Sequence, residues 1–236
     1  MSRTLTLTLL ISSSLALVSP CFGDLVIASG AGSTLSGAQD LTGDNVSEIQ
    51  GTLSGTDLND ASLFKIFITD AADFSAMTVF SNAFDIQDTV LSLFDSSGVG
   101  VYLNDDADPA NPADTFSCLP SADAANPCAN DRGGAGPVSD GVYYLAISRG
   151  ANYPLDNMGN EIFAPLLSTD VVGPSSSNPL DSWDGGAFTV TDFDLVDYDI
   201  VLTGGGVETP EPATLPVILG ALLLGVFWRR RLAQSA

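Results

Sequence analysis

Short stretches of alternating apolar and polar residues run through the middle of the chain. Between residues 63 and 68, Phe64, Ile66 and Ile68 fall on one face, which is the period-two pattern of a half-buried strand. Residues 196–203 repeat the pattern. Further strands are expected at 25–28, 48–53, 75–80, 89–94, 99–103, 142–147 and 187–191. No segment before residue 213 combines helical periodicity with caps. The pattern predicts an all-β chain folded as an antiparallel β-sandwich.

Turn-forming and irregular stretches separate these strands. Asp95-Ser96-Ser97-Gly98 is a turn signal, so the strands on either side of it are expected to form a hairpin. Residues 104–140 and 150–186 show little periodicity and are predicted to be long loops. Three consecutive glycines at 204–206 predict a flexible hinge. We therefore divide the exported part into N-terminal strands at 24–57, a β-sandwich domain at 58–204 and a linker at 205–209.

The N-terminal end has the form of a secretory signal peptide. A short positive start at Arg3 precedes an apolar stretch at 5–18, and small residues stand at Cys21 and Gly23. Cleavage is therefore expected after Gly23, with residues 1–23 removed. An uncleaved anchor and a lipoprotein acylated at Cys21 are the alternatives, and Pro20 fits the lipoprotein poorly.

The C-terminal end has three consecutive parts. Pro210, Glu211 and Pro212 cannot continue a helix, because each proline fixes φ and lacks a backbone donor. Residues 213–228 carry no charge and are predicted to form a short transmembrane helix of roughly 24 Å. Arg229, Arg230 and Arg231 then predict a cytoplasmic C-terminus. The alternative is a buried helix of a soluble domain, which would not end in three arginines.

This three-part tail at 210–231 resembles the PEP-CTERM sorting signal of Gram-negative bacteria. The resemblance implies that an exosortase-type membrane protease processes the chain near Pro-Glu-Pro. It also implies transient insertion in the inner membrane through 213–228, followed by delivery to the cell surface or an extracellular matrix. It implies nothing about what the rest of the chain does.

The part between the two ends is strongly acidic. In residues 24–209, only Lys65, Arg132 and Arg149 oppose 28 acidic residues, which gives a net charge of −25. Such a charge excludes nucleic acid and anionic membrane surfaces as natural partners. It is compatible with divalent cation binding and, equally, with solubility in high salt.

Two cysteines remain after removal of the signal peptide. Cys118 and Cys128 lie ten positions apart in the first long loop. In an oxidising compartment they are expected to form a disulfide. A zinc site is the alternative, but two cysteines without any histidine make a poor ligand set.

Catalytic chemistry is scarce in this sequence. The chain contains no histidine, so Ser-His and Cys-His nucleophiles are impossible. Paired carboxylates could hydrolyse a glycosidic bond, but with so many acids a close pair carries little weight. We therefore do not expect an enzyme; a secreted hydrolase of unfamiliar type is the residual alternative.

A calcium site is the strongest candidate for a cofactor. Asn104, Asp106 and Asp108 alternate, with Asp105 between them, and calcium takes six to eight oxygen ligands. Asp85 and Asp88 precede the strand that feeds this hairpin and are expected to contribute across the loop, with less support. The alternative is that these residues only form turns.

The strands carry a second resemblance. The segments 63–68, 90–98 and 198–202, with Asn-Asp-Asp at 104–106 and Gly-Val-Tyr-Tyr at 141–144, are similar to the bacterial pre-peptidase C-terminal domain. That resemblance covers about residues 58–204 and implies a small jelly-roll-like sandwich on a secreted protein. The long loops at 107–139 and 150–186 depart from it.

These observations leave three hypotheses for function. The first is an exported surface or matrix protein with a non-catalytic, adhesive or structural role in exopolysaccharide. The second is a calcium-stabilised module that binds carbohydrate or protein. The third is the unfamiliar secreted hydrolase.

Overall fold

The computed structural model describes residues 23–54, 57, 59–81, 86, 88–107, 115–121, 136–164, 171–186 and 197–208. These residues form strands β1 to β13 and one short 3₁₀ helix, η1 (Leu35–Gly37), so the all-β prediction is confirmed. The predicted signal peptide, the strand at 187–191 and the apolar segment 213–228 lie outside the described residues. Among the described residues, none belongs to a helix with the length and apolar character needed to cross a bilayer.

The first sheet brings together both ends of the described chain. Its strand order is β1-β3-β12-β5-β8. The strands are β1 (Asp24–Ile27), β3 (Val46–Thr52), β12 (Asp197–Thr203), β5 (Ser75–Thr78) and β8 (Cys118–Leu119). Of the N-terminal strands predicted at 24–57, β1 and β3 therefore lie in the same sheet as β12. The pairing of β1 with β3 is parallel, whereas the other pairs are antiparallel.

The second sheet has the strand order β13-β4-β9-β6-β7. These strands are β13 (Gly205–Gly206), β4 (Ala61–Ile68), β9 (Gly141–Arg149), β6 (Thr89–Asp95) and β7 (Gly100–Asn104). A short strand, β2 (Gln39–Asp40), lies parallel beside β4. The antiparallel expectation thus holds for most pairs, and each of the two parallel pairs joins one short strand, β1 or β2, to a longer strand, β3 or β4.

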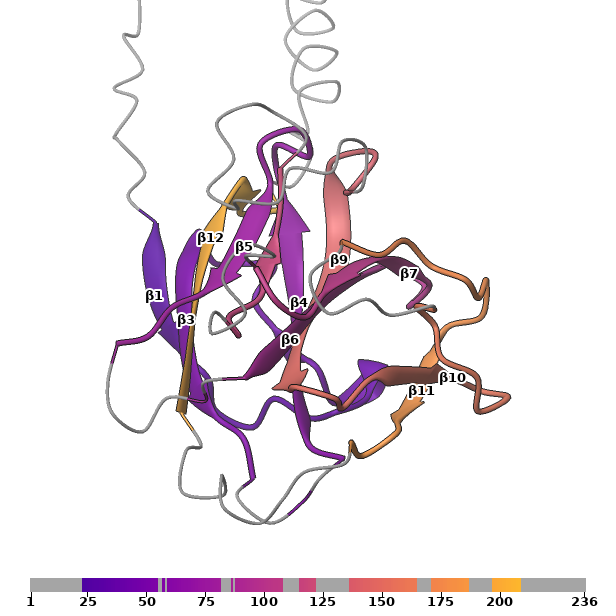
Figure 1. Ribbon diagram of the computed structural model, residues 1–236. Coiled ribbons are helices and arrows are strands. Elements are labelled where there is room, and N and C mark those ends of the chain that lie inside the picture. The colour runs from indigo at the N-terminus through magenta and orange to yellow at the C-terminus, as the bar shows by residue number, and fades with distance from the viewer. Residues whose placement is uncertain are drawn as a thin grey trace, which may run out of the picture.

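The main core lies between the two sheets. Ile49 and Ile200 contribute from the first sheet, and Phe64, Leu93 and Ile147 from the second. All five side chains are fully buried. Because alternate side chains of a strand point to opposite faces, each sheet turns one apolar face toward the other. This arrangement is a β-sandwich, and Figure 1 shows β4, β6 and β9 beside the sheet of β1, β3 and β12.

A second core covers the opposite face of the β4-β9-β6 sheet. The stretch predicted as irregular from 150 to 186 contains β10 (Pro154–Asp156) and β11 (Leu180–Trp183), which pair with each other. Phe163 from this region packs against Phe94 of β6, with ring centroids 5.9 Å apart. Trp183 is buried here and donates its indole N–H to the Ser33 carbonyl, 2.8 Å away. The second sheet is therefore buried on both faces.

The structure corrects the prediction of a flexible hinge at 204–206. Gly205 and Gly206 form β13, which pairs with Ile68 and Phe67 of β4. Gly204 has φ of +69°, a conformation that glycine adopts without steric cost. Its carbonyl accepts the Thr69 backbone N–H at 2.9 Å. The glycines allow close approach of two backbones here rather than freedom of movement.

The predicted turn after β6 is present and sets the register of the β6-β7 hairpin. Asp95 Oδ1 accepts the backbone N–H of Ser97 at 2.8 Å and that of Val99 at 3.1 Å. Gly98 takes a φ of +85°, which a left-handed turn position requires. Leu91 consequently lies opposite Asn104. The residues just before β6 and just after β7 meet at the same end of the hairpin.

Asp156, at the end of β10, organises the layer that covers the second sheet. Its side chain is buried. The carboxylate accepts hydrogen bonds from Met158 N, Asn160 N, Ser176 Oγ and Asn178 Nδ2. These hydrogen bonds hold the pKa of Asp156 well below its ordinary value. A carboxylate with a lowered folded pKa stabilises the protein above its unfolded pKa, and this contribution is lost as the pH falls through the folded pKa.

Replacing Asp156 with Ala is expected to lower the Tm at pH 7, because the groups that donate to its carboxylate lose their acceptor. The difference from wild type should shrink in melts at progressively lower pH, below about 4, where the unfolded carboxyl is protonated. Asp181→Ala, at an exposed position of β11, is the matched control and should leave the Tm nearly unchanged. An equal effect of the two substitutions would contradict this role.

Candidate metal centre

Three carboxylates converge at the open end of the β6-β7 hairpin. Asp88 immediately precedes β6, and Asp105 and Asp106 immediately follow β7. Each places one carboxylate oxygen within 4.8 Å of the oxygens of the other two. The hairpin register brings these residues together, because the start of β6 lies beside the end of β7. We call Asp88, Asp105 and Asp106 the carboxylate cluster.

Asp105 forms the buried floor of the carboxylate cluster. It is 7% exposed, and its Oδ2 accepts the Tyr153 hydroxyl hydrogen at 2.7 Å. Its Oδ1 is buried and has no hydrogen-bond partner among the described residues. Burial raises the pKa of Asp105 to about 7, opposed by the Tyr153 hydrogen bond and reinforced by the charges of Asp88 and Asp106. An unpartnered buried carboxylate oxygen is costly, and a cation would satisfy it.

Tyr153 lies in the turn between β9 and β10, and its hydroxyl donates a hydrogen bond to Asp105 Oδ2. Burial, followed by the negative charge of Asp105, raises the pKa of the Tyr153 phenol above its ordinary value. The phenol therefore remains a hydrogen-bond donor throughout the physiological pH range. It orients Asp105 through Oδ2.

The position of Asp88 depends on Gly150. The Gly150 backbone N–H donates to the Asp88 carbonyl at 2.9 Å. A Cβ atom at residue 150 would overlap the Asp88 carboxylate. The absence of a side chain at Gly150 thus makes room for Asp88 next to the end of β9.

A network of buried hydroxyls fixes the backbone below the cluster and ties it to the first sheet. Ser117 Oγ donates to the Asp105 carbonyl at 2.8 Å and also to the Thr89 carbonyl. The Thr89 hydroxyl lies 3.0 Å from Ser117 Oγ and 2.9 Å from the Thr78 hydroxyl. Thr78 belongs to β5 and Thr89 to β6, so the cluster is built on rigid elements of both sheets.

The carboxylate cluster contains three of the residues predicted for the calcium site. Asn104 is buried, and its side chain closes the turn: Nδ2 donates to the Asp106 carbonyl at 3.0 Å, and Oδ1 accepts the Cys118 backbone N–H at 2.7 Å. Asn104 thus positions the loop through both atoms of its side-chain amide, and its role as a calcium ligand stays a prediction. Asp85 and Asp108 lie outside the described residues. Cys118 is buried in β8, and its predicted partner Cys128 is also outside them.

Sequence reasoning missed Gly150 and Tyr153 as parts of this site. Each is separated from the carboxylates along the chain, and no local motif links either residue to the cluster. The spacing of acids at 104–108 indicated where a cation would bind. Only the fold shows which side chains surround it.

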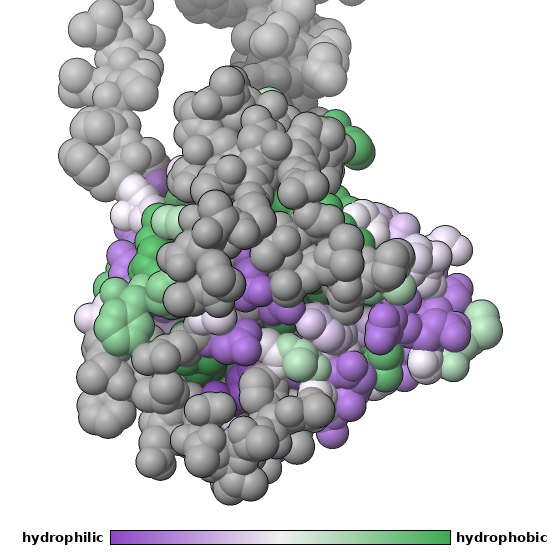
Figure 2. All heavy atoms as spheres, in the orientation of Figure 1, coloured by the Kyte–Doolittle hydropathy of each residue, from purple (hydrophilic) through white to green (hydrophobic). Residues whose placement is uncertain are grey.

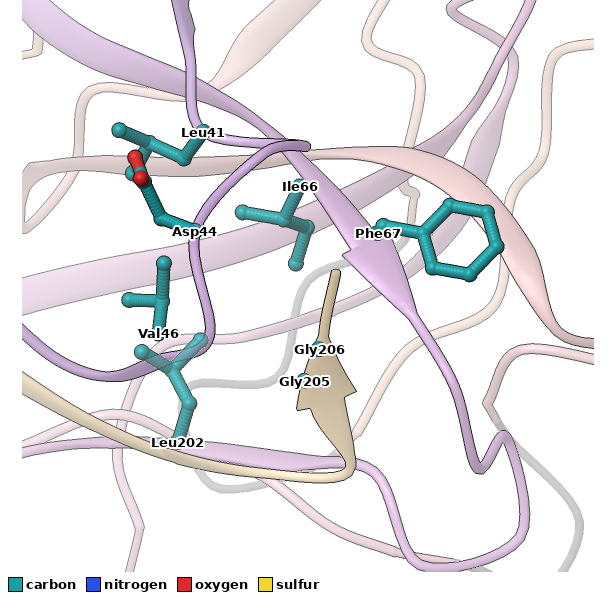
Figure 3. A pocket seen from close by; sticks show the side chains of 8 residues that line it. All are labelled: Leu41, Asp44, Val46, Ile66, Phe67, Leu202, Gly205 and Gly206. Carbon is teal, nitrogen blue, oxygen red and sulfur yellow. The ribbon is translucent and has the colours of Figure 1, made fainter. Parts of the chain in front are cut away.

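A small apolar pocket lies elsewhere, between the ends of the two sheets. Figure 3 shows its lining: Leu41, Asp44, Val46, Ile66, Phe67, Leu202, Gly205 and Gly206. Asp44 is the one ionisable residue in this lining. Binding pockets for small molecules usually combine an apolar wall with several convergent polar groups, so we regard this pocket as a packing feature beside β13.

Hydrophobic side chains are exposed at the open edge of the first sheet. Leu25 and Ile27 of β1 are 52% and 62% exposed. Figure 2 shows hydrophobic side chains on the side of the molecule where β1 lies, next to hydrophilic ones. Two exposed residues on a four-residue strand make a small patch, within what monomeric proteins tolerate.

Comparison with known families identifies the tail. The family described as the PEP-CTERM protein-sorting motif matches residues 208–231. The chain therefore carries a PEP-CTERM sorting motif, as its sequence predicted. No curated protein and no solved structure matches the chain. The resemblance of residues 58–204 to the pre-peptidase C-terminal domain has no matching family model and stays a prediction.

The motif defines the route of the protein. It implies that the protein is exported and that an exosortase-type protease processes it. The protein is then located at the cell surface or in the extracellular space. The last strand of the folded part, β13, ends at Gly206, just before the matched segment begins at residue 208.

Proposed function

We propose that this protein is a non-catalytic component of the cell surface or extracellular matrix, with an adhesive or structural role in exopolysaccharide. The observation that carries the proposal is the sorting motif at 208–231, joined directly to a β-sandwich. A chain without histidine supports the non-catalytic part. The predicted inner-membrane stage through residues 213–228 belongs to the same proposal.

The location is tested in the producing cells. We expect a shortened chain, lacking both termini, in the surface or matrix fraction. Deletion of the gene is expected to reduce the cohesion of the matrix, measured as the polysaccharide retained on cells after shear. A full-length chain of 236 residues in the soluble cytosol would overturn the proposal.

A calcium ion in the carboxylate cluster is the second part of the proposed function. Calcium prefers carboxylate and carbonyl oxygens and accepts flexible geometry, whereas magnesium demands a near-ideal octahedron and keeps its waters. An ion here would relieve the repulsion among three negative charges. It would also provide the missing partner of Asp105 Oδ1. Extracellular calcium modules typically have Kd values of about 10⁻⁴–10⁻³ M.

Calcium at millimolar concentration is accordingly expected to raise the Tm of the purified processed protein above its value in EDTA. Binding to the native state alone stabilises by about 1.4 kcal/mol when the ion is present at tenfold its Kd. Differential scanning calorimetry in 5 mM calcium, 5 mM magnesium and EDTA measures this effect. Equal Tm values in calcium and in EDTA would contradict the proposed calcium site.

Gly150→Ala is expected to weaken calcium binding about tenfold, because the new methyl group displaces the Asp88 carboxylate. Losses of about 10–100-fold are typical when groups that position a ligand are changed. Titration calorimetry against calcium measures the change. Gly173→Ala is the control, since a Cβ at Gly173 meets no atom within 4 Å. Unchanged affinity in Gly150→Ala would contradict the role of Asp88.

A further inference from the structure

We propose that calcium bound in the carboxylate cluster holds the layer over the second sheet in place and so protects the exported protein from proteases. This inference rests on the proposed calcium site and gives that site a regulatory role. The layer consists of the described residues 154–164 and 171–184, which include β10 and β11. We call it the covering layer. The turn 149–153 leads from the end of β9 into this layer.

The turn 149–153 contacts two of the three carboxylate residues of the cluster. Near its start, the Gly150 backbone N–H donates to the Asp88 carbonyl at 2.9 Å, and the Asp88 carboxylate occupies the space that a Cβ at residue 150 would take. At its end, the Tyr153 hydroxyl donates to Asp105 Oδ2 at 2.7 Å. An ion that holds Asp88 and Asp105 together therefore also fixes both ends of the turn.

The same turn holds the far end of the covering layer. The Tyr153 backbone N–H donates to Asp184 Oδ1 at 2.8 Å, and the Asp184 N–H donates to the Tyr153 carbonyl at 3.0 Å. Asn152 is fully buried; its Nδ2 donates to the Asp60 carbonyl at 3.0 Å, and its Oδ1 accepts the Gly185 N–H at 3.0 Å. The turn thus connects the cluster to the residues that follow β11 and to the residue that precedes β4.

Backbone strain in the turn favours its release when these contacts weaken. Ala151 has a φ of +55° and is the one non-glycine residue with a positive φ in the described part of the chain. Such a conformation persists only where the surrounding structure enforces it. Without an ion, repulsion among three neighbouring carboxylates weakens the contacts of Asp88 and Asp105 with the turn. We therefore expect the covering layer to open locally in the metal-free protein, at a lower free energy than global unfolding.

Trypsin can report this opening, because it cleaves after lysine and arginine and residues 24–209 contain only Lys65, Arg132 and Arg149. Arg149 is 5% exposed at the start of the turn, so the bond to Gly150 becomes accessible when the turn opens. Lys65 lies within β4 and is paired with β2 on one side and β9 on the other, so cleavage there reports unfolding of the second sheet. Arg132 lies outside the described residues, and Arg132→Gln removes its cleavage site from all samples.

The processed protein is digested in EDTA and in calcium at tenfold its Kd, and the fragments are identified by mass. In EDTA we expect cleavage after Arg149 at least tenfold faster than after Lys65, because local opening precedes global unfolding. If opening releases the ion, calcium at tenfold its Kd lowers the open population about tenfold. Cleavage after Arg149 should slow by the same factor, because native-state proteolysis follows that population. A short arginine peptide digested in the same buffers corrects for any effect of calcium on trypsin.

Tyr153→Phe tests the connection between the cluster and the covering layer. The variant keeps the ring that packs against the second core and removes the hydroxyl that donates to Asp105. With calcium at tenfold the variant's own Kd, the protection of Arg149 should fall at least threefold, as expected for loss of a hydrogen bond to a charged group. Tyr144→Phe is the control, because Tyr144 of β9 packs against the same core, and it should retain the protection of the wild type.

The reverse effect provides a second, independent variant. Coupling between two sites is reciprocal, so loosening the covering layer should weaken calcium binding. Asp184→Ala removes the exposed acceptor of the Tyr153 N–H, which lies outside the carboxylate cluster. Titration calorimetry should show at least a threefold loss of calcium affinity. Asp184→Asn removes the same charge but keeps an oxygen acceptor, and its affinity should stay close to that of the wild type.

The outcomes separate the role of the covering layer from the calcium site itself. Calcium-dependent protection of Arg149 that Tyr153→Phe reduces, with weaker calcium binding in Asp184→Ala, supports the proposal. A calcium-dependent rise in Tm with unchanged cleavage after Arg149 overturns the role of the layer and leaves the calcium site. Equal rates after Arg149 and Lys65 in EDTA, or full protection in Tyr153→Phe, do the same. No rise in Tm with calcium overturns both.

Discussion

Asp105→Asn is expected to abolish the calcium-dependent rise in Tm and, at the same time, to raise the Tm measured in EDTA at pH 8. Both effects follow from the position of Asp105 on the floor of the carboxylate cluster. The variant keeps an oxygen for the Tyr153 hydrogen bond but removes one of three negative charges. The lost calcium response tests the metal site, and the higher Tm in EDTA tests the cost of burying the ionised Asp105 carboxylate.

The size of the effect in EDTA follows from the pKa of Asp105. Burial, with the charges of Asp88 and Asp106, raises this pKa to about 7, from an ordinary value of about 4. The folded protein therefore binds a proton more tightly than the unfolded chain does. The contribution of Asp105 to metal-free stability therefore falls as the pH rises from about 4 to about 7 and is level above that range. At about 1.4 kcal/mol per pH unit, the cost of ionising Asp105 above pH 7 is about 4 kcal/mol.

Thermal unfolding of wild type and Asp105→Asn between pH 4 and pH 8, in EDTA and in 5 mM calcium, measures both effects. Asp181→Asn is the control for a simple change in net charge. It should follow the wild type in all conditions, because Asp181 is exposed on β11. A calcium response retained in Asp105→Asn, or a fall in its Tm in EDTA at pH 8, would contradict the assignment of Asp105.

Replacement of Pro210, Glu211 and Pro212 by alanine is expected to remove the protein from the cell surface. The three residues lie within the matched sorting motif at 208–231. Alanine favours helix, whereas proline interrupts it. The triple substitution therefore extends the predicted helix of 213–228 toward the folded domain and removes the recognition turn. The exosortase-type protease should then leave the tail uncut, and the precursor should accumulate in the membrane fraction.

Fractionation of the producing cells, with the mass of the intact chain from each fraction, checks this result. We expect at least a tenfold loss of surface protein. Gln234→Ala combined with Ser235→Ala is the control, because both residues follow the matched segment. Normal processing and surface delivery of the triple variant would show that the protease does not recognise the Pro-Glu-Pro sequence.

The strands of the second sheet were predictable from local pattern, although what covers their outer face was not. The alternation at 63–68 correctly predicts part of β4. In β6, residues 89–94 are all buried, because the layer containing β10 and β11 covers the face turned away from the main core. A short apolar run shows that a strand is buried but not what covers it. The covering layer was therefore predicted as a loop.

The candidate site was predictable as a region and not as a set of residues. Asp105 and Asp106 belong to the acidic run that the sequence indicated, and Asp88 was named with less support. Alternate spacing favoured Asn104, but its side chain is engaged in closing the turn with Asp106 and Cys118. The position of Asp88 depends on the register of two strands, and spacing within one loop contains no information on register.

The sorting motif at 208–231, the acidic charge and the all-β character could be read from the sequence alone, because each depends on consecutive residues or on composition. The sheet order, the second core and the carboxylate cluster belong to the tertiary structure. Asp105 meets Tyr153 across 48 positions of chain, and no pattern within either segment encodes that meeting. The local sequence determines where strands and turns form. The pairing of strands that are distant in the sequence determines which acidic side chains lie close together and become buried.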